Sequence, residues 1–123
     1  MKNLIFSVLF VLLFSGVVFA QTQTDLNIEA GQRYELADRE LNLVYNQIRA
    51  RYAHSPLLLE KLRDAQRLWI QFRDASVLAV FPEDNPRDHY GSMYPMLVSN
   101  LLERLTRDRI QQLREVYLEQ FYY

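Results

Sequence analysis

The polar residues best placed to do chemistry lie in the segment AQRLWIQFRDA, residues 65–75. Its two rings, Trp69 and Phe72, fall on one face of any helix drawn through the segment. Four hydrogen-bonding side chains surround them: Gln66, Arg67, Arg73 and Asp74. Such a group can form a binding site, a surface for a partner, or the polar edge of a hydrophobic core.

The usual signatures of catalysis do not occur elsewhere in the sequence. It has no cysteine and no Gly-x-Ser-x-Gly motif, so nucleophilic catalysis has no support. His54 and His89 stand apart from clustered ligands such as HExxH, which argues against a metal site. Only Gly31 and Gly91 follow residue 20, so there is no glycine-rich phosphate loop. We therefore expect a non-enzymatic protein with no metal and no cofactor.

A second chemically distinctive segment is PEDNPRDHYGS, residues 82–92. It carries three acidic residues and one arginine, a net charge of −2 with histidine neutral. Long connections between helices are often functional, and prolines reduce the entropy lost on binding. We expect this segment to bind a cationic partner, and its candidate binding residues are Glu83, Asp84, Asp88, His89, Tyr90 and Ser92. A solvated spacer that caps the next helix is the alternative.

Helices must position both segments, because apolar residues recur at intervals of three and four. We predict an all-α bundle of three main helices at about residues 32–53, 56–81 and 93–119. Ser55 and Pro56 are typical of an N-cap and a first helical turn. The pattern does not decide whether residues 22–30 add a short helix.

The first 20 residues have the features of a secretory signal peptide. Lys2 precedes an apolar run, residues 4–14, that is too short for a comfortable transmembrane span. We expect cleavage before Gln21, with no cysteine there to accept a lipid. One domain, residues 21–123, would then act in the periplasm or outside the cell. A retained N-terminal anchor is the alternative.

The charge balance argues against a nucleic-acid partner and against membrane insertion of the mature chain. After residue 20 the sequence has 13 basic and 15 acidic residues, which is not the basic footprint of a nucleic-acid binder. Lys61 is the only lysine among these 13 basic residues. Arginine holds bidentate hydrogen bonds better than lysine, so we expect fixed ion pairs.

One arginine of the third predicted helix points into the core by helical spacing. Arg109 lies within an apolar stripe that consists of Val98, Leu102, Leu105, Leu113 and Val116. An unpaired buried guanidinium costs on the order of several kcal/mol, and Asp38 is the only acid on the inner margin of the first helix. We predict that Arg109 binds Asp38, directly or through Asn42. Arg73 or Gln66 would lie close by.

These five residues would form a polar clamp that fixes the register of the helices. A catalytic or ligand-binding cluster is one alternative. An arginine whose long stem carries its charge out to water is the other.

The second predicted helix is apolar over a wide arc. Its main stripe consists of Leu58, Leu62, Ala65, Trp69, Phe72, Ser76 and Val80. A second apolar strip, offset from the first, consists of Leu59, Ile70, Val77 and Phe81. Arg67 and Asp74 fall opposite the main stripe, toward solvent or a partner. The helix is either packed from two sides or partly exposed for a partner.

Several motifs in order resemble one family. They are AD-ELN--Y at residues 37–45, AQR-W--FRDA at 65–75, Gly91-Ser92, and LT--R---L at 105–113. Together they are similar to the exported domain at the N-terminus of LprI-type lysozyme inhibitors, which also occurs alone in small periplasmic proteins. The resemblance covers about residues 30–115. It implies an all-helical exported domain and, for some members, inhibition of lysozyme.

The sequence departs from the family at two positions. Members usually have cysteines where this chain has Val77 and Leu101, which implies that an apolar contact replaces a disulfide. We predict that Val77 and Leu101 touch. Without the bridge, the loop between them would be less rigid.

Our first hypothesis is an exported inhibitor of lysozyme-like muramidases. It would present residues 83–93, or the face with Arg67 and Asp74, to a cationic lysozyme. The alternative is a periplasmic structural or adaptor module that docks on an envelope protein through the second helix.

Overall fold

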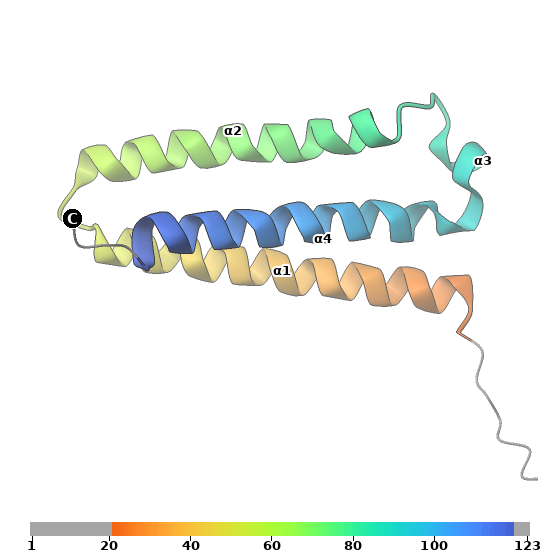
Figure 1. The fold of residues 1–123 in the computed structure, drawn as a ribbon, viewed down its shortest axis with the longest axis horizontal. Coiled ribbons are helices and arrows are strands. Elements are labelled where there is room, and N and C mark those ends of the chain that lie inside the picture. Colours follow the sequence, from red (N-terminus) through yellow and green to blue (C-terminus); the bar gives the residue numbers. More distant parts are fainter. Residues whose placement is uncertain (1–20, 120–123) are drawn as a thin grey trace, which may run out of the picture.

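The computed structural model describes residues 21–119 and confirms the predicted all-α fold. Three long helices form it: α1 (Gln23–Arg51), α2 (Pro56–Val80) and α4 (Tyr94–Leu113). Short elements follow α2 and α4, namely α3 (Pro86–Tyr90), the 3-10 turn η1 (Gly91–Met93) and the π-helical turn η2 (Arg114–Leu118). Figure 1 shows α1 and α4 side by side along their length, with α2 set apart from them. The predicted signal peptide lies outside the described residues.

The first helix begins at Gln23, well before the predicted start at residue 32. A capping box explains this start. The Asp25 amide donates to Thr22 Oγ1 at 3.1 Å, and the Thr22 amide donates to the Asp25 carboxylate at 3.1 Å. These hydrogen bonds lower the pKa of Asp25 below its ordinary value. Two backbone donors of the first turn are thereby satisfied, so residues 23–30 belong to α1.

The second helix begins at Pro56, as predicted, and Ser55 is its N-cap residue. The side chain of Ser55, however, forms no capping hydrogen bond. Backbone bonds close the turn instead. The Ser55 amide donates to the Tyr52 carbonyl at 2.9 Å, and the Leu59 amide donates to the Ser55 carbonyl at 3.1 Å.

The core lies mainly between α1 and α4. The predicted stripe of α1 is confirmed at its buried members, which are Ala37, Leu41, Val44 and Ile48. The buried residues of α4 are Leu101, Thr106, Ile110 and Leu113. This face overlaps the predicted stripe only in part: Leu113 belongs to both, but Leu102 is only half-buried and Val116 is 53% exposed. Arg109 therefore stands at the edge of the buried face and not at its middle.

The predicted core stripe of α2 is wrong in part. Leu62 is the only fully buried residue of this helix, and Trp69 packs against the same core cluster. Phe72 is 58% exposed and Val80 is 50% exposed, and Ala65 also faces solvent. Since α2 packs only sparsely on the other two helices, it buries a narrow face in place of the wide arc.

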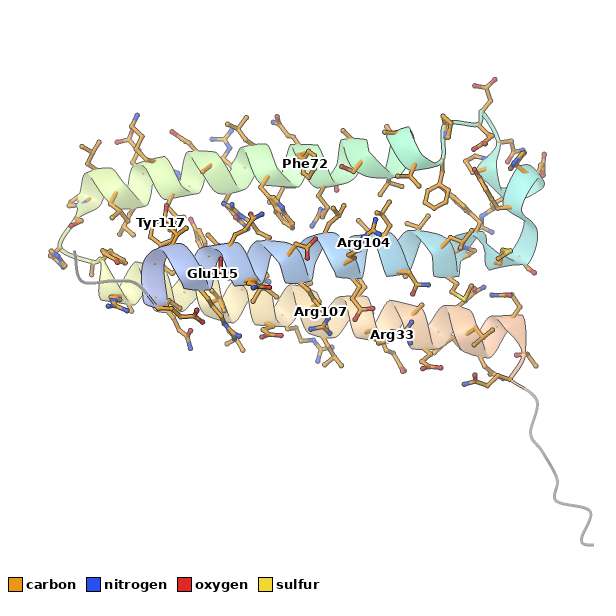
Figure 2. All side chains as sticks on the ribbon, viewed as in Figure 1. Arg33, Phe72, Arg104, Arg107, Glu115 and Tyr117 are labelled. Carbon is orange, nitrogen blue, oxygen red and sulfur yellow. The ribbon has the colours of Figure 1, made fainter. Side chains whose placement is uncertain are left out.

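A chain of ion pairs joins α1 to α4 on the side away from α2, and it confirms the expectation of fixed arginine pairs. Arg33 and Arg107 hold Glu103 at 3.2 Å and 2.9 Å. Arg107 and Arg114 hold Glu40 at 3.5 Å and 2.9 Å. Figure 2 shows Arg33 and Arg107 projecting along this seam. Burial alone would raise the pKa of Glu103, but its hydrogen bonds to Arg107 and Arg33 outweigh this and lower it.

The Glu103 pairs make stability depend on pH. A carboxylate with a lowered pKa stabilises the fold above its unfolded-state pKa, and this contribution is lost as the pH falls through the folded-state pKa. We expect Glu103→Gln to cost roughly 1 kcal/mol at pH 7, because both arginines are partly exposed. The cost should shrink toward zero as the pH falls through the lowered folded-state pKa of Glu103. Urea unfolding of both proteins at several pH values measures this, and a cost that does not change with pH contradicts it.

Candidate functional site

Residues of the motifs at 37–45 and 65–75 meet at an open cleft between α1 and α2, which we call the signature cleft. It encloses about 230 Å³, and its walls include Asp38, Asn42, Gln66, Trp69 and Arg73. Four of the five predicted clamp residues thus line one space. The fifth, Arg109, reaches this group through a hydrogen bond from its Nε to Gln66 Oε1 at 3.0 Å.

The predicted bond between Arg109 and Asp38 is wrong. The guanidinium of Arg109 instead donates to two amides, those of Gln66 at 3.0 Å and Gln112 at 3.4 Å. Within residues 21–119, neither Arg109 nor Asp38 forms an ion pair. The reason is that Ile110, and not Arg109, faces the core, and a half-buried guanidinium at the edge of a core reaches water and needs no carboxylate. Burial lowers the pKa of Arg109 and outweighs the opposing effect of the nearby Tyr117.

Arg73 is held on its own helix. Its guanidinium lies 5.5 Å from the centre of the Trp69 ring and bonds Asp74 Oδ1 at 2.8 Å and 2.9 Å. The side chain is only 16% exposed, so it covers one part of the tryptophan. Burial raises the pKa of the neighbouring Tyr34, against the opposing charge of Arg73. Arg73 and Trp69 therefore pack together as one wall of the signature cleft.

The opposite wall of the cleft belongs to α1 and includes Asp38 and Asn42. Asp38 is half-buried and Asn42 is exposed, although both were predicted to be engaged in the clamp. Their oxygens can accept hydrogen bonds from a polar group that enters the cleft. No group of three or more metal-ligating side chains occurs within residues 21–119.

The bond between Gln66 and Arg109 gives a direct test of the clamp. In a double-mutant cycle on stability, we expect Gln66→Leu and Arg109→Leu to be coupled by about 1 kcal/mol. The matched cycle of Asp38→Leu with Arg109→Leu should show coupling below about 0.3 kcal/mol. Stronger coupling through Asp38 would contradict the geometry.

Residues 82–93, in the connection between α2 and α4, are folded and include α3 and η1; we call them the acidic connection. Phe81, only 8% exposed, anchors it by packing edge-on against Tyr90 at 5.2 Å and Tyr94 at 5.5 Å. The Tyr90 hydroxyl donates to Glu83 Oε1 at 2.9 Å. Asn27 of α1 donates to the Ser92 carbonyl at 2.9 Å, which ties the connection to the bundle. Gly91 adopts a positive φ of 65°, a conformation that side chains disfavour.

The six predicted binding residues of the acidic connection divide into two groups. Glu83 and Tyr90 are half-buried and bond each other, so they serve its internal structure. The others face solvent: Asp84, Asp88, His89 and Ser92. Asp88 accepts a bond from Asn85 at 2.6 Å, which fixes its carboxylate. The exposed acids are thus presented on a preformed surface.

The remaining predicted residues lie on α2 and α4. Arg67 and Asp74 are both exposed, as expected of a solvent- or partner-facing surface. Val77 is half-buried on α2 and Leu101 is 7% exposed on α4. Their contact stays a prediction.

Sequence reasoning missed two features of these surfaces. One is the pairing of Arg73 with Trp69, although their spacing of four residues is a signal for contact on a helix. The other is Asn27, which lies in the part of α1 whose helical structure the apolar pattern did not decide.

The fold and the cleft define this chain as a small all-α domain in which residues of the motifs at 37–45 and 65–75 line a cleft between the first two long helices. The sequence model of the family described as "Lysozyme inhibitor LprI" matches residues 19–113, so the chain belongs to the LprI lysozyme inhibitor family. The chain is also similar to "Uncharacterized protein R02472" of Rhizobium meliloti (strain 1021). The two are 42% identical over 112 residues, with 79% of this chain and 75% of that protein covered. No solved structure matches the chain.

Proposed function

We propose that this protein is an exported, non-enzymatic inhibitor of lysozyme-like muramidases. Its membership in the LprI lysozyme inhibitor family over residues 19–113 is the observation that carries the proposal. The apolar leader before Gln21 supports export to the periplasm or beyond. None of the helices within residues 21–119 is long and apolar enough to cross a membrane.

The acidic connection is the surface that best fits a cationic enzyme. Asp84 and Asp88 are exposed there, and opposite charge on the two partners accelerates association. The aromatic cluster of Phe81, Tyr90 and Tyr94 holds these acids in place before binding. A preformed surface loses less conformational entropy in a complex, so this rigidity favours affinity.

Inhibition needs only that the bound protein cover the substrate groove. Glycoside hydrolysis depends on two carboxyl groups that flank the scissile bond, and a protein seated over them excludes the polysaccharide. The acids of the connection would bind cationic residues at the rim of the groove and take no part in a reaction. The protein would therefore inhibit by occupying the substrate groove of the enzyme.

A turbidity assay of peptidoglycan hydrolysis tests the proposal. Residues 21–123 at micromolar concentration should slow a c-type lysozyme in proportion to the complex formed. A panel with g-type and i-type enzymes measures the specificity. No inhibition of any type at this concentration would refute the proposed function.

An adaptor module that docks on an envelope protein through α2 is the second candidate. The exposed apolar residues of α2 favour it, above all Leu68 at 65% and Phe72 at 58% exposed. Capture of an envelope partner by a variant that lacks residues 83–90, together with no inhibition of lysozyme, would support this candidate against the first.

A further inference from the structure

The signature cleft is lined by polar groups that the fold itself does not use. Within residues 21–119, four lining side chains form no hydrogen bond and no ion pair: Asp38, Asn42, Arg63 and Arg67. Gln66 accepts the Arg109 hydrogen bond through Oε1, so its amide nitrogen keeps two hydrogens for another partner. The cleft therefore presents hydrogen-bond acceptors from α1 and donors from α2 to a ligand that enters it.

Aromatic and aliphatic side chains complete the lining of the cleft. Tyr45 and Trp69 are half-buried and pack against the core cluster, and Leu41 and Ile70 line the same space. Such a lining suits a ligand that has both an apolar surface and polar groups. The volume of about 230 Å³ lies below the roughly 300–1,000 Å³ of sites that enclose drug-sized ligands, so it suits one small ring that stays partly open to water.

The cleft adjoins a second groove that leads toward the turn between α1 and α2. Tyr45 and Arg63 line both spaces. The second groove holds about 650 Å³, and its other lining residues are Arg49, Pro56, Leu59 and Glu60. A ligand with one unit in the cleft can therefore continue past Arg63 as a chain of more than one unit.

The charge of the two adjoining spaces favours an anionic ligand. Four arginines and two acids line them, a net charge of +2, although the chain after residue 20 carries −2. Arg73 is paired with Asp74, but the other three arginines form no ion pair within residues 21–119. Asp64 stands near Arg67 on the outer side of α2 and does not pair with it. Since a guanidinium binds a carboxylate through two parallel hydrogen bonds, a carboxylate is the anion that these arginines suit.

Asp38 favours an acidic sugar over an acidic peptide. It is half-buried in the wall of the cleft, where its charge would repel a chain of carboxylates. The same carboxylate accepts hydrogen bonds from hydroxyl groups, and so does the oxygen of Asn42. A sugar ring offers hydroxyls to this wall and an apolar face to Tyr45 and Trp69. A carboxylate on the sugar would then bind the unpaired arginines of α2.

We infer that the signature cleft binds a short oligosaccharide that carries a carboxylate. The inference does not rest on the proposed function, because none of the cleft residues belongs to the acidic connection. The dissociation constant should be roughly 0.1–1 mM, because a small cleft that is open to water makes few fully desolvated contacts.

Fluorescence of residues 21–123 tests the inference, because Trp69 is the only tryptophan of the sequence and lies in the cleft. Two acidic disaccharides are the probes: N-acetylglucosaminyl-N-acetylmuramic acid, with its carboxylate on a side chain, and digalacturonic acid, with carboxylates on its rings. At least one should change the Trp69 emission and saturate with the expected constant, and the comparison shows which position of the carboxylate fits. The neutral disaccharide N,N′-diacetylchitobiose should bind at least about tenfold more weakly.

A pair of arginine variants tests the role of charge. Arg63→Gln with Arg67→Gln should weaken binding of the acidic disaccharide at least about tenfold, with an unchanged helical circular dichroism spectrum. Arg87→Gln with Arg104→Gln is the matched control and should bind like the parent. It removes the same charge from two exposed arginines outside the cleft, and Figure 2 shows one of them, Arg104, on α4.

Asp38→Asn separates a sugar from a plain anion. It should weaken binding of the acidic disaccharide about threefold, because a neutral amide accepts hydroxyl hydrogen bonds less strongly than a carboxylate. It should strengthen binding of tetraglutamate, an acidic peptide that the parent binds more weakly than the sugar, because a repelling charge is removed. Stronger binding of the sugar by this variant would overturn the inference. So would no binding of either acidic disaccharide at about 10 mM, equal binding of the neutral one, or tighter binding of tetraglutamate than of both sugars.

Discussion

Leu62→Ala is expected to lower the free energy of unfolding by about 3 kcal/mol and the melting temperature by roughly 15 °C. Leu62 is 2% exposed and is the only fully buried residue of α2. Its side chain joins the core cluster of Leu41, Val44 and Ile48, so truncation leaves a cavity there. Because α2 packs sparsely on the other helices, little other packing can compensate. Thermal and urea unfolding measure both quantities.

Leu57→Ala is the matched control for this prediction. It makes the same chemical change in the same helix, but Leu57 is 67% exposed. Its cost should stay below about 0.5 kcal/mol. Equal effects of the two substitutions would mean that α2 is not anchored through Leu62.

The double variant Asp84→Asn and Asp88→Asn is expected to weaken inhibition of a c-type lysozyme about tenfold at low salt. Two exposed charges that each contribute roughly 0.7 kcal/mol give this factor. Most of the loss should appear in the association rate, and it should shrink at about 0.5 M salt, where exposed charges are screened. Inhibition curves at two salt concentrations measure the effect. The prediction rests on the proposed function.

Glu60→Gln with Asp108→Asn is the matched control. It removes the same charge from two exposed sites away from the acidic connection. We expect this variant to inhibit within about twofold of the parent, and both double variants to keep the parent melting temperature to within a few degrees. Equal loss in the two variants would show that net charge, and not the acidic connection, drives binding.

The fold class could be predicted because its signals are local. Apolar spacing and the prolines at 56 and 82 placed α2 to within a residue of its observed ends. The start of α1 was missed because its signal is a capping box, Thr22 with Asp25, and not an apolar period. The sequence contained this signal, but the apolar pattern alone does not reveal it.

The polar clamp could be predicted only in part. Gln66 does hold Arg109, but the partnership with Asp38 failed because α4 carries two overlapping apolar strips. Leu101 and Leu102 are adjacent candidates for one core position, and Arg109 and Ile110 are adjacent candidates for another. Leu101 and Ile110 are the ones that are buried. The neighbouring helix decides which strip is buried, and a single helix cannot encode that choice. The same ambiguity placed Phe72 wrongly in the core.

The five residues of the predicted clamp therefore divide into two groups. Arg109, Gln66 and Arg73 fix the walls of the signature cleft through bonds within residues 21–119. Asp38 and Asn42 line the same cleft and form no ion pair there. In this chain, residues of the motifs at 37–45 and 65–75 contribute both to the packing of α2 and to an open polar cleft.

Direct binding of residues 21–123 to a c-type lysozyme is the most direct test of the central claim. Isothermal titration should show saturable binding, one lysozyme per chain, that weakens with salt. A chitin oligosaccharide that fills the substrate groove should compete with it. Absence of binding at micromolar concentrations, or binding that the oligosaccharide leaves unchanged, would contradict an inhibitor that acts by covering the groove.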